Sequence, residues 1–158
     1  MLENMITDRT AADVLRWREL RDKGLARMTA AELAEWKAGM KGSYNISDLN
    51  RVGAALSYLR SELIKYGYLI GIEFVPKADW TENDVPTRQD YASFVNSVDI
   101  VRDALAWYKT TPEAPNVLGK LDFQGANDIE KILLDVDELL TKTNAKPYYC
   151  GELYCGEI

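Results

Sequence analysis

The chain has 158 residues, of which 47% are hydrophobic and 28% are charged, and its net charge is −6. This length fits one domain, and the hydrophobic fraction is sufficient for a buried core. The acidic balance, with no basic cluster, argues against nucleic-acid binding. No stretch reaches the roughly 18 apolar residues of a membrane-spanning helix. The first residues lack the basic start and apolar stretch of a signal peptide, so we expect neither membrane insertion nor a signal peptide.

The absence of histidine removes the commonest general base and most catalytic zinc sites. The only two cysteines, Cys150 and Cys155, cannot complete a zinc site alone, although two chains could supply four thiolates. No glycine-rich phosphate-binding loop follows a strand. We therefore expect no catalytic residues, no metal and no cofactor.

Two short helices are predicted at the start of the chain. The first runs over about 8–23, with Thr7 or Thr10 as N-cap and Gly24 as its end. The second runs over about 30–41 and ends at Gly42. It begins with a capping box, Thr29-Ala30-Ala31-Glu32, in which the Thr hydroxyl and the Glu carboxylate each accept a backbone N–H.

Three long helices follow, each with a continuous apolar seam at helical spacing. They are predicted over about 48–66 (N-cap Ser47, end Gly67), about 88–108 (N-cap Thr87) and about 123–143 (N-cap Asp122). The expected core comprises Leu56, Leu59, Leu63, Val98, Val101, Leu105, Ile132, Val136 and Leu139. Matching seams of this length predict a mainly α fold, a three-helix bundle with near-antiparallel packing.

Two segments depart from helical periodicity. Residues 68–75 alternate apolar side chains between Gly67 and Pro76, which predicts a strand. The second segment is an extended tail, 147–158, which follows a helical domain over 1–146. This tail holds one five-residue unit written twice, Tyr-Cys-Gly-Glu-Leu and Tyr-Cys-Gly-Glu-Ile. In a strand, a period of five places equivalent side chains on opposite faces, so a straight tail would use its two copies on two different surfaces.

Four stretches in combination resemble a known module. They are 6–14; 28–32 with 39–45 and 48–52; 79–87; and 126–137 with the Tyr-x-Gly-Glu-Leu ending. The module occurs in prophage-encoded structural proteins of gut Firmicutes, among tail or baseplate genes. The resemblance covers nearly the whole chain and implies a virion role without a defined biochemical activity. This chain departs from the pattern at Cys150 and Cys155, where the family more often has serine or another small residue, which weakens a metal or disulfide interpretation.

The leading hypothesis is therefore a bacteriophage virion component, a tail, baseplate or fibre-associated adaptor that acts through protein–protein contacts and assembles in the bacterial cytoplasm. Its expected partners are other phage structural subunits, further copies of itself and a host-surface receptor. The candidate interaction residues are Trp80 and six residues of the tail: Tyr149, Cys150, Leu153, Tyr154, Cys155 and Ile158.

Two other functions are alternatives to this hypothesis. A receptor- or carbohydrate-binding module could use the four tryptophans as stacking platforms, but Trp17, Trp36 and Trp107 lie on predicted amphipathic helices, and burial is more usual there. A hydrolase with paired carboxylates is disfavoured because acidic clusters on helices are mostly solvated faces or caps. Its candidate residues are Asp135, Asp137 and Glu138, or Asp79, Glu82 and Asp84.

Two asparagines next to seam residues, Asn50 and Asn127, have a further interpretation. Either they specify the register between helices or they bond local backbone near helix N-termini, and we favour the second interpretation. Gly53, three residues after Asn50, would let a neighbouring backbone approach closely.

Overall fold

The computed structural model describes residues 2, 4–117 and 120–145. These residues form five α-helices and one short 3-10 turn, and no strand is found among them. The elements are α1 (Ala11–Lys23), η1 (Leu25–Arg27), α2 (Ala30–Lys37), α3 (Ile46–Lys65), α4 (Arg88–Asp103) and α5 (Phe123–Ala145). The mainly α-helical prediction is confirmed.

Capping side chains set the beginnings of the helices. Thr10, Thr29 and Thr87 each accept the backbone N–H three residues on, and the acidic residue there accepts the N–H of the cap in return. The prediction was wrong for α3, where Asn45 rather than Ser47 is the N-cap. Asp122 accepts the backbone N–H of Gly125 at 2.8 Å, as expected of a cap for α5.

Two helices end earlier than predicted. Helix α2 ends at Lys37, and Gly39 follows with φ 85°, a region that glycine occupies without the steric cost of a Cβ. Helix α4 ends at Asp103. Trp107 therefore lies beyond the helix, and it is half exposed.

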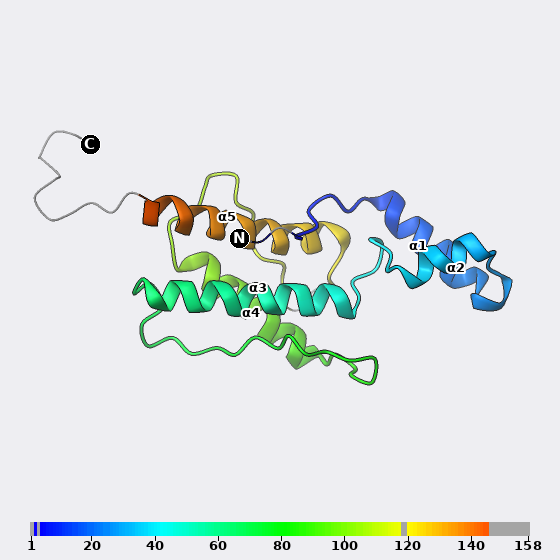
Figure 1. Cartoon of the computed structure of the whole chain (residues 1–158), viewed down its shortest axis with the longest axis horizontal. Helices are drawn as coiled ribbons and strands as arrows, with labels where there is room; N and C mark the ends of the chain where they lie inside the picture. Colours follow the sequence, from blue (N-terminus) through cyan, green and yellow to red (C-terminus); the bar gives the residue numbers. More distant parts are fainter. Residues whose placement is uncertain (1, 3, 118–119, 146–158) are drawn as a thin grey trace, which may run out of the picture.

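Helices α3, α4 and α5 pack into a bundle around one apolar core (Figure 1). Leu59, Val98 and Ile132 are completely buried, as the seams predicted, whereas Leu105 and Leu139 are half buried. The buried core consists of Val52, Ala55, Leu56, Leu59, Leu63, Leu69, Val98, Val101, Ile129, Ile132, Leu133, Val136 and Leu140.

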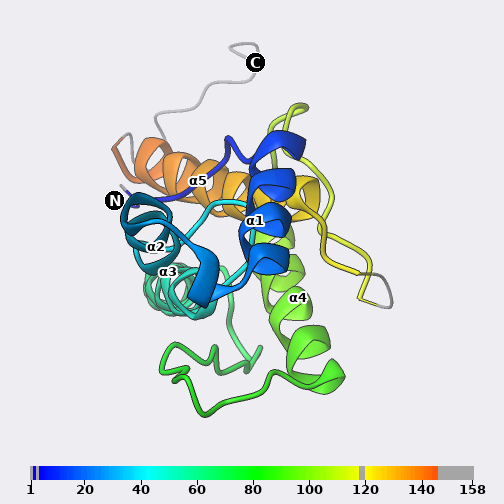
Figure 2. The same ribbon diagram turned by 90° about the vertical axis from the view of Figure 1, so that its right-hand side faces the viewer.

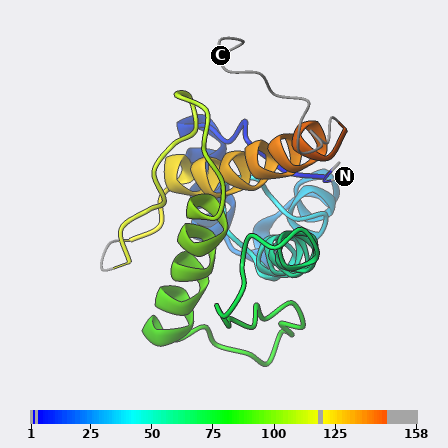
Figure 3. The same ribbon diagram turned by 90° about the vertical axis from the view of Figure 1, so that its left-hand side faces the viewer.

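The directions of the helices differ from the near-antiparallel arrangement expected. Arg51 bonds Glu130 and Tyr58 bonds Asp137, so in both pairs the α5 residue stands 79 positions after its α3 partner. A constant difference of this kind means that α3 and α5 run in the same direction. Helix α4 crosses α3 steeply, since α3 is seen nearly end-on in Figures 2 and 3 while α4 runs across the view.

Long connections make this topology possible. Residues 66–87 run back along α3 (Figure 1), and residues 104–122 return to the start of α5. The first connection contains the segment predicted as a strand. It is instead a turn followed by irregular chain, with Leu69 buried, Ile70 and Val75 almost fully exposed, and φ 78° at Gly71.

The first connection passes directly against α3. A Cβ added to Gly53 would lie 2.1 Å from the carbonyl oxygen of Lys77, so only glycine permits this approach. The expectation that a neighbouring backbone comes close at Gly53 is confirmed.

Helices α1 and α2 form a hairpin that projects beyond the end of the bundle (Figure 1). Ion pairs between Arg16 and Glu35 (2.8 Å) and between Lys23 and Glu32 (2.6 Å) join the two helices. The base of the hairpin is fixed at Gly42, where an added Cβ would lie 2.0 Å from the carbonyl oxygen of Asp13. We call residues 11–37 the N-terminal hairpin.

The hairpin gives a pH prediction. The Lys23 ammonium, together with the Thr29 N–H, lowers the pKa of Glu32 from its ordinary value of 4.5 to about 2. Because this pKa is lower in the folded chain, ionised Glu32 stabilises the hairpin above about pH 4.5, and this contribution is lost as the pH falls towards 2. An NMR titration of the Glu32 carboxyl should show the low midpoint. Lys23→Ala should raise the Glu32 midpoint towards 4.5. Lys37→Ala, on the same helix as Glu32, should leave the midpoint unchanged. An unchanged midpoint in both variants would contradict the pairing of Lys23 with Glu32.

Candidate functional site

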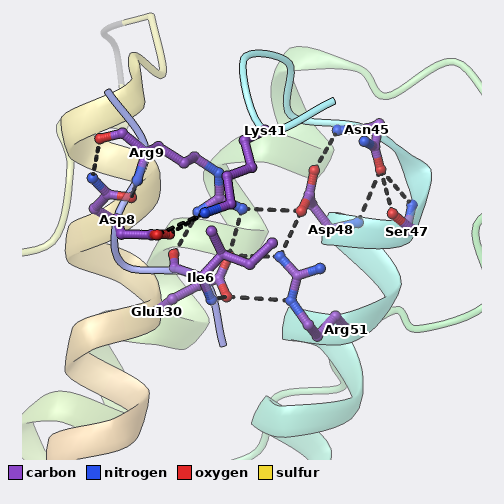
Figure 4. A network of polar contacts seen from close by, with 10 residues as sticks. Ile6, Asp8, Arg9, Lys41, Asn45, Ser47, Asp48, Arg51 and Glu130 are labelled. Atoms are coloured by element: carbon purple, nitrogen blue, oxygen red, sulfur yellow. Dashed lines mark hydrogen bonds and ion pairs between the residues drawn. The ribbon is translucent and has the colours of Figure 1, made fainter. Parts of the chain in front are cut away.

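Four charged side chains meet where the N-terminal ends of α3 and α5 lie side by side (Figure 4). Arg9 precedes α1, Asp48 and Arg51 belong to the first turns of α3, and Glu130 lies in the second turn of α5. The Arg9 Nη2 donates to Asp48 Oδ1 at 2.9 Å and to Glu130 Oε1 at 2.7 Å. We call these four residues the ion cluster.

Arg51 closes the ion cluster from the other side. Its Nη2 donates to Asp48 Oδ1 at 2.5 Å and to Glu130 Oε1 at 2.8 Å, and its Nε donates to Glu130 Oε2 at 3.2 Å. Two positive and two negative groups make the cluster neutral. The side chains of Arg9, Asp48 and Glu130 are at most 5% exposed, so these charges are largely shielded from solvent and depend on one another.

The carboxylates of the ion cluster also hold backbone groups. Glu130 Oε2 accepts the N–H of Ile6 at 2.5 Å, and Asp48 Oδ2 accepts the N–H of Asn45 at 2.9 Å. Asp48 therefore caps α3 and binds both arginines at once. Any change that moves this carboxylate is expected to affect the start of α3 and the position of Arg9 together.

An extended segment ahead of α1 lies along α5, and we call residues 4–10, with Leu2, the N-terminal strap. Polar side chains of α5 bind its backbone: Asp137 accepts the N–H of Leu2 at 3.1 Å, and Asn127 bonds both the N–H and the carbonyl of Arg9, at 3.0 and 2.9 Å. Because residue 2 meets 137 and residue 9 meets 127, the strap runs antiparallel to α5.

A cavity of about 710 Å³ lies between the N-terminal hairpin, the loop that follows it and the start of α5. We call it the hairpin cavity. Its lining combines apolar and aromatic side chains with four cations, Arg9, Arg18, Lys41 and Lys120, and one carboxylate, Asp122. The apolar and aromatic members are Ala11, Val14, Leu15, Trp17, Tyr44, Leu121, Phe123 and Ala126.

The cations of the hairpin cavity are not equally available. Lys41 is paired with Asp8 at 2.6 Å, and Arg9 belongs to the ion cluster. Arg18 and Lys120 are exposed, and no ion pair of theirs is found among the described residues. An acidic group that reached this cavity would therefore meet two uncommitted positive charges beside apolar surface.

Tyr44 lies where the hairpin cavity meets the bundle, with its ring beneath the Arg9 guanidinium. Burial and the nearby carboxylates of Glu130 and Asp48 raise the pKa of the Tyr44 hydroxyl. This hydroxyl is buried, and it has no hydrogen-bond partner among the described residues. Tyr44 is thus neutral at physiological pH.

Trp80, the candidate interaction residue within the described chain, is buried rather than presented to a partner. Only 8% of it is exposed, and it lines a small apolar pocket together with Leu49, Tyr91 and Phe94. Lys77 covers its ring with the ammonium 4.1 Å from the centroid. The other six candidates, from Tyr149 to Ile158, lie outside the described residues.

Asn50 and Asn127 bond distant backbone, so the favoured expectation of local bonds was wrong. The Asn50 side chain bonds both backbone groups of Trp80. Its oxygen accepts the Trp80 N–H at 2.7 Å, and its nitrogen donates to the Trp80 carbonyl at 2.9 Å. Asn127 does the same for Arg9, 118 residues away. Each amide thus attaches an extended segment to a helix.

Replacing Asn50 by alanine should lower the free energy of unfolding by about 1–3 kcal/mol, because the Trp80 backbone loses both partners in a partly buried place. Urea unfolding would measure this change. The exposed Asn96 of α4 provides the matched control, and Asn96→Ala should change stability by less than about 0.5 kcal/mol. Equal effects would show that the Asn50 amide holds nothing in solution.

Four of the six carboxylates considered for hydrolysis, Asp84, Asp135, Asp137 and Glu138, already have structural partners. Asp135 accepts the Thr111 hydroxyl at 2.8 Å and is paired with Lys131, Asp137 binds Leu2 and Tyr58, and Glu138 pairs with Lys142. Asp84 caps a turn by accepting from the N–H of Thr81 at 2.7 Å. Among the described residues, no group of three or more acidic or cysteine side chains is arranged to hold a metal ion.

Sequence reasoning missed the ion cluster and the hairpin cavity. A signal for the cluster does exist in α5, where Glu130 and Asp137 occur seven residues apart on the face that also carries Ala126 and Leu133. Acidic residues at a helical repeat within an apolar face indicate buried partners. The partners Arg51 and Tyr58 show the same spacing of seven on α3.

Comparison with protein-family models, with curated proteins and with solved structures found no match. Within the described residues, none of the helices combines the length and the apolar character needed to cross a membrane.

Proposed function

We propose that this chain is a structural component of a bacteriophage particle, a tail, baseplate or fibre-associated adaptor that works through protein–protein contacts. The observation that carries the proposal is the division of the chain into a firmly packed bundle and a projecting hairpin, with a cavity between them. An adaptor needs these two parts, a rigid body and a surface that its own core leaves open.

The rigidity of the body supports this role. The ion cluster and the two asparagines tie the N-terminal strap and the 66–87 connection to α3 and α5. Since the strap leads directly into α1, the same contacts set the position of the hairpin. A projecting element held at a fixed place can present the same surface in every copy of a particle.

The hairpin also presents apolar side chains to solvent. Leu15 on α1 and Leu25 in η1 are 58% and 59% exposed. Single exposed leucines are ordinary, but Leu15 also lines the hairpin cavity and so adds to its apolar wall. Such a surface fits an interface formed after folding.

The test is whether the chain is part of the particle. Prophage induction in the strain that encodes it, followed by density-gradient purification and quantitative mass spectrometry, should recover the chain with the particles at a fixed ratio to the capsid protein. That ratio should stay unchanged after a wash in about 1 M salt, which screens interactions between surface charges. The proposal fails if the chain stays in the unsedimented fraction together with a host cytoplasmic protein of similar size.

A further inference from the structure

The hairpin cavity lies at the N-terminal end of α5, opposite the end from which the sequence continues to residue 146. Phe123 and Ala126, at the start of α5, line the cavity, and α5 ends at Ala145 (Figure 1). At about 1.5 Å per residue, the helix places these two points roughly 29 Å apart. The C-terminal end of α5 therefore lies far from the cavity.

The sequence of 146–158 complements the cavity in chemistry. It carries two copies of a unit with an aromatic residue, an acid and an aliphatic residue: Tyr149, Glu152 and Leu153, then Tyr154, Glu157 and Ile158. The cavity offers aromatic and aliphatic walls beside Arg18 and Lys120, which are free of ion pairs among the described residues. Apolar side chains would enter the cavity while the glutamates meet the cations.

The distance that this segment can span decides whether it reaches the cavity of its own chain or that of a second chain. An extended chain covers about 3.3 Å per residue, so crossing roughly 29 Å back along α5 uses about nine residues. The first unit, 149–153, begins only four residues after Ala145, a span of about 13 Å at this rise, so it cannot reach the cavity of its own chain. A neighbouring copy, by contrast, can receive both units.

We propose that the hairpin cavity of one copy receives residues 146–158 of a second copy. This inference rests on the proposed function and names the partner at that surface. Because the donating segment and the receiving cavity are different parts of the chain, the contact is head to tail. Repetition of such a contact builds a ring or a filament.

The experiment measures self-association of the full chain by light scattering across a range of concentrations. Leu15→Glu places a charge at the cavity wall, whereas Leu25→Glu makes the same change at an equally exposed leucine outside it. Leu15→Glu should weaken association by about tenfold or more, and Leu25→Glu should leave it unchanged. Circular dichroism should show the same helicity for both variants, because neither side chain is buried.

Charge reversal provides a second variant that leaves the bundle untouched. Glu152→Lys with Glu157→Lys should weaken association, and adding Arg18→Glu with Lys120→Glu should restore part of it. A monomeric wild-type chain, equal effects of the two leucine variants, or no restoration would each overturn the inference. If the chain associates as expected but is absent from particles, the inference stands and the proposed function fails. If the chain is in particles and Leu15→Glu associates normally, the proposed function stands and the inference fails.

Discussion

Replacing Arg9 by alanine should lower the free energy of unfolding by about 3–5 kcal/mol, a cost typical of removing one partner from a buried ion pair. Glu130 is completely buried, and the substitution leaves it and Asp48 sharing a single arginine. The N-terminal strap would also lose its main attachment to α3. Urea unfolding followed by circular dichroism measures the change.

The control is a second ion pair of similar length at the surface. Lys41 and Asp8 lie 2.6 Å apart, and their side chains are 45% and 71% exposed. Lys41→Ala should therefore cost no more than about 1 kcal/mol. If Arg9→Ala costs as little as this control, the ion cluster does not hold the strap in solution.

Leu59→Ala should cost about 2–5 kcal/mol, since Leu59 has no exposed surface and lies in the core shared by α3, α4 and α5. The loss combines the transfer of buried methyl groups with the cavity that remains. Ile64→Ala on the same helix is the matched control because Ile64 is 41% exposed, and it should cost much less. A loss below about 0.5 kcal/mol at Leu59 would contradict its place in the core.

The helices could be predicted from sequence because their signals are local. The Thr29 and Glu32 side chains, three residues apart, form the capping box that starts α2, and the repeat of Leu56, Leu59 and Leu63 identifies the buried face of α3. Both kinds of signal lie within one or two turns of helix, so they do not depend on the rest of the fold.

The prediction at residues 68–75 was wrong because alternation alone does not supply a partner. A strand needs a neighbour to bond, and none is found among the described residues. Here the Tyr68 N–H instead bonds the Leu63 carbonyl at 2.8 Å to finish α3, and Gly71 turns the chain. The apolar residues of the segment serve separately, with Leu69 in the core and Phe74 packed beside it.

The ion cluster could not be predicted because its members are joined only by the fold. Arg9 lies 39 residues from Asp48 and 121 from Glu130, and nothing in the local sequence selects these pairs. The direction of α5 was missed for a similar reason. The apolar spacing along a helix does not show in which direction the helix runs relative to its neighbours. Only the length of the connections, 66–87 and 104–122, indicates that the chain can run back along the bundle before the next helix begins.

The attachment of the strap to α5 has a consequence for synthesis on the ribosome. At about 5–20 residues per second, the 121 residues that separate Arg9 from Glu130 take roughly 6–24 s to emerge. Asp48, only 39 residues on, is made much sooner and is the first of Arg9's two acidic partners to become available. The N-terminal strap can reach its final position only after α5 has been synthesised. Its residues are made first but are among the last to be placed in the fold.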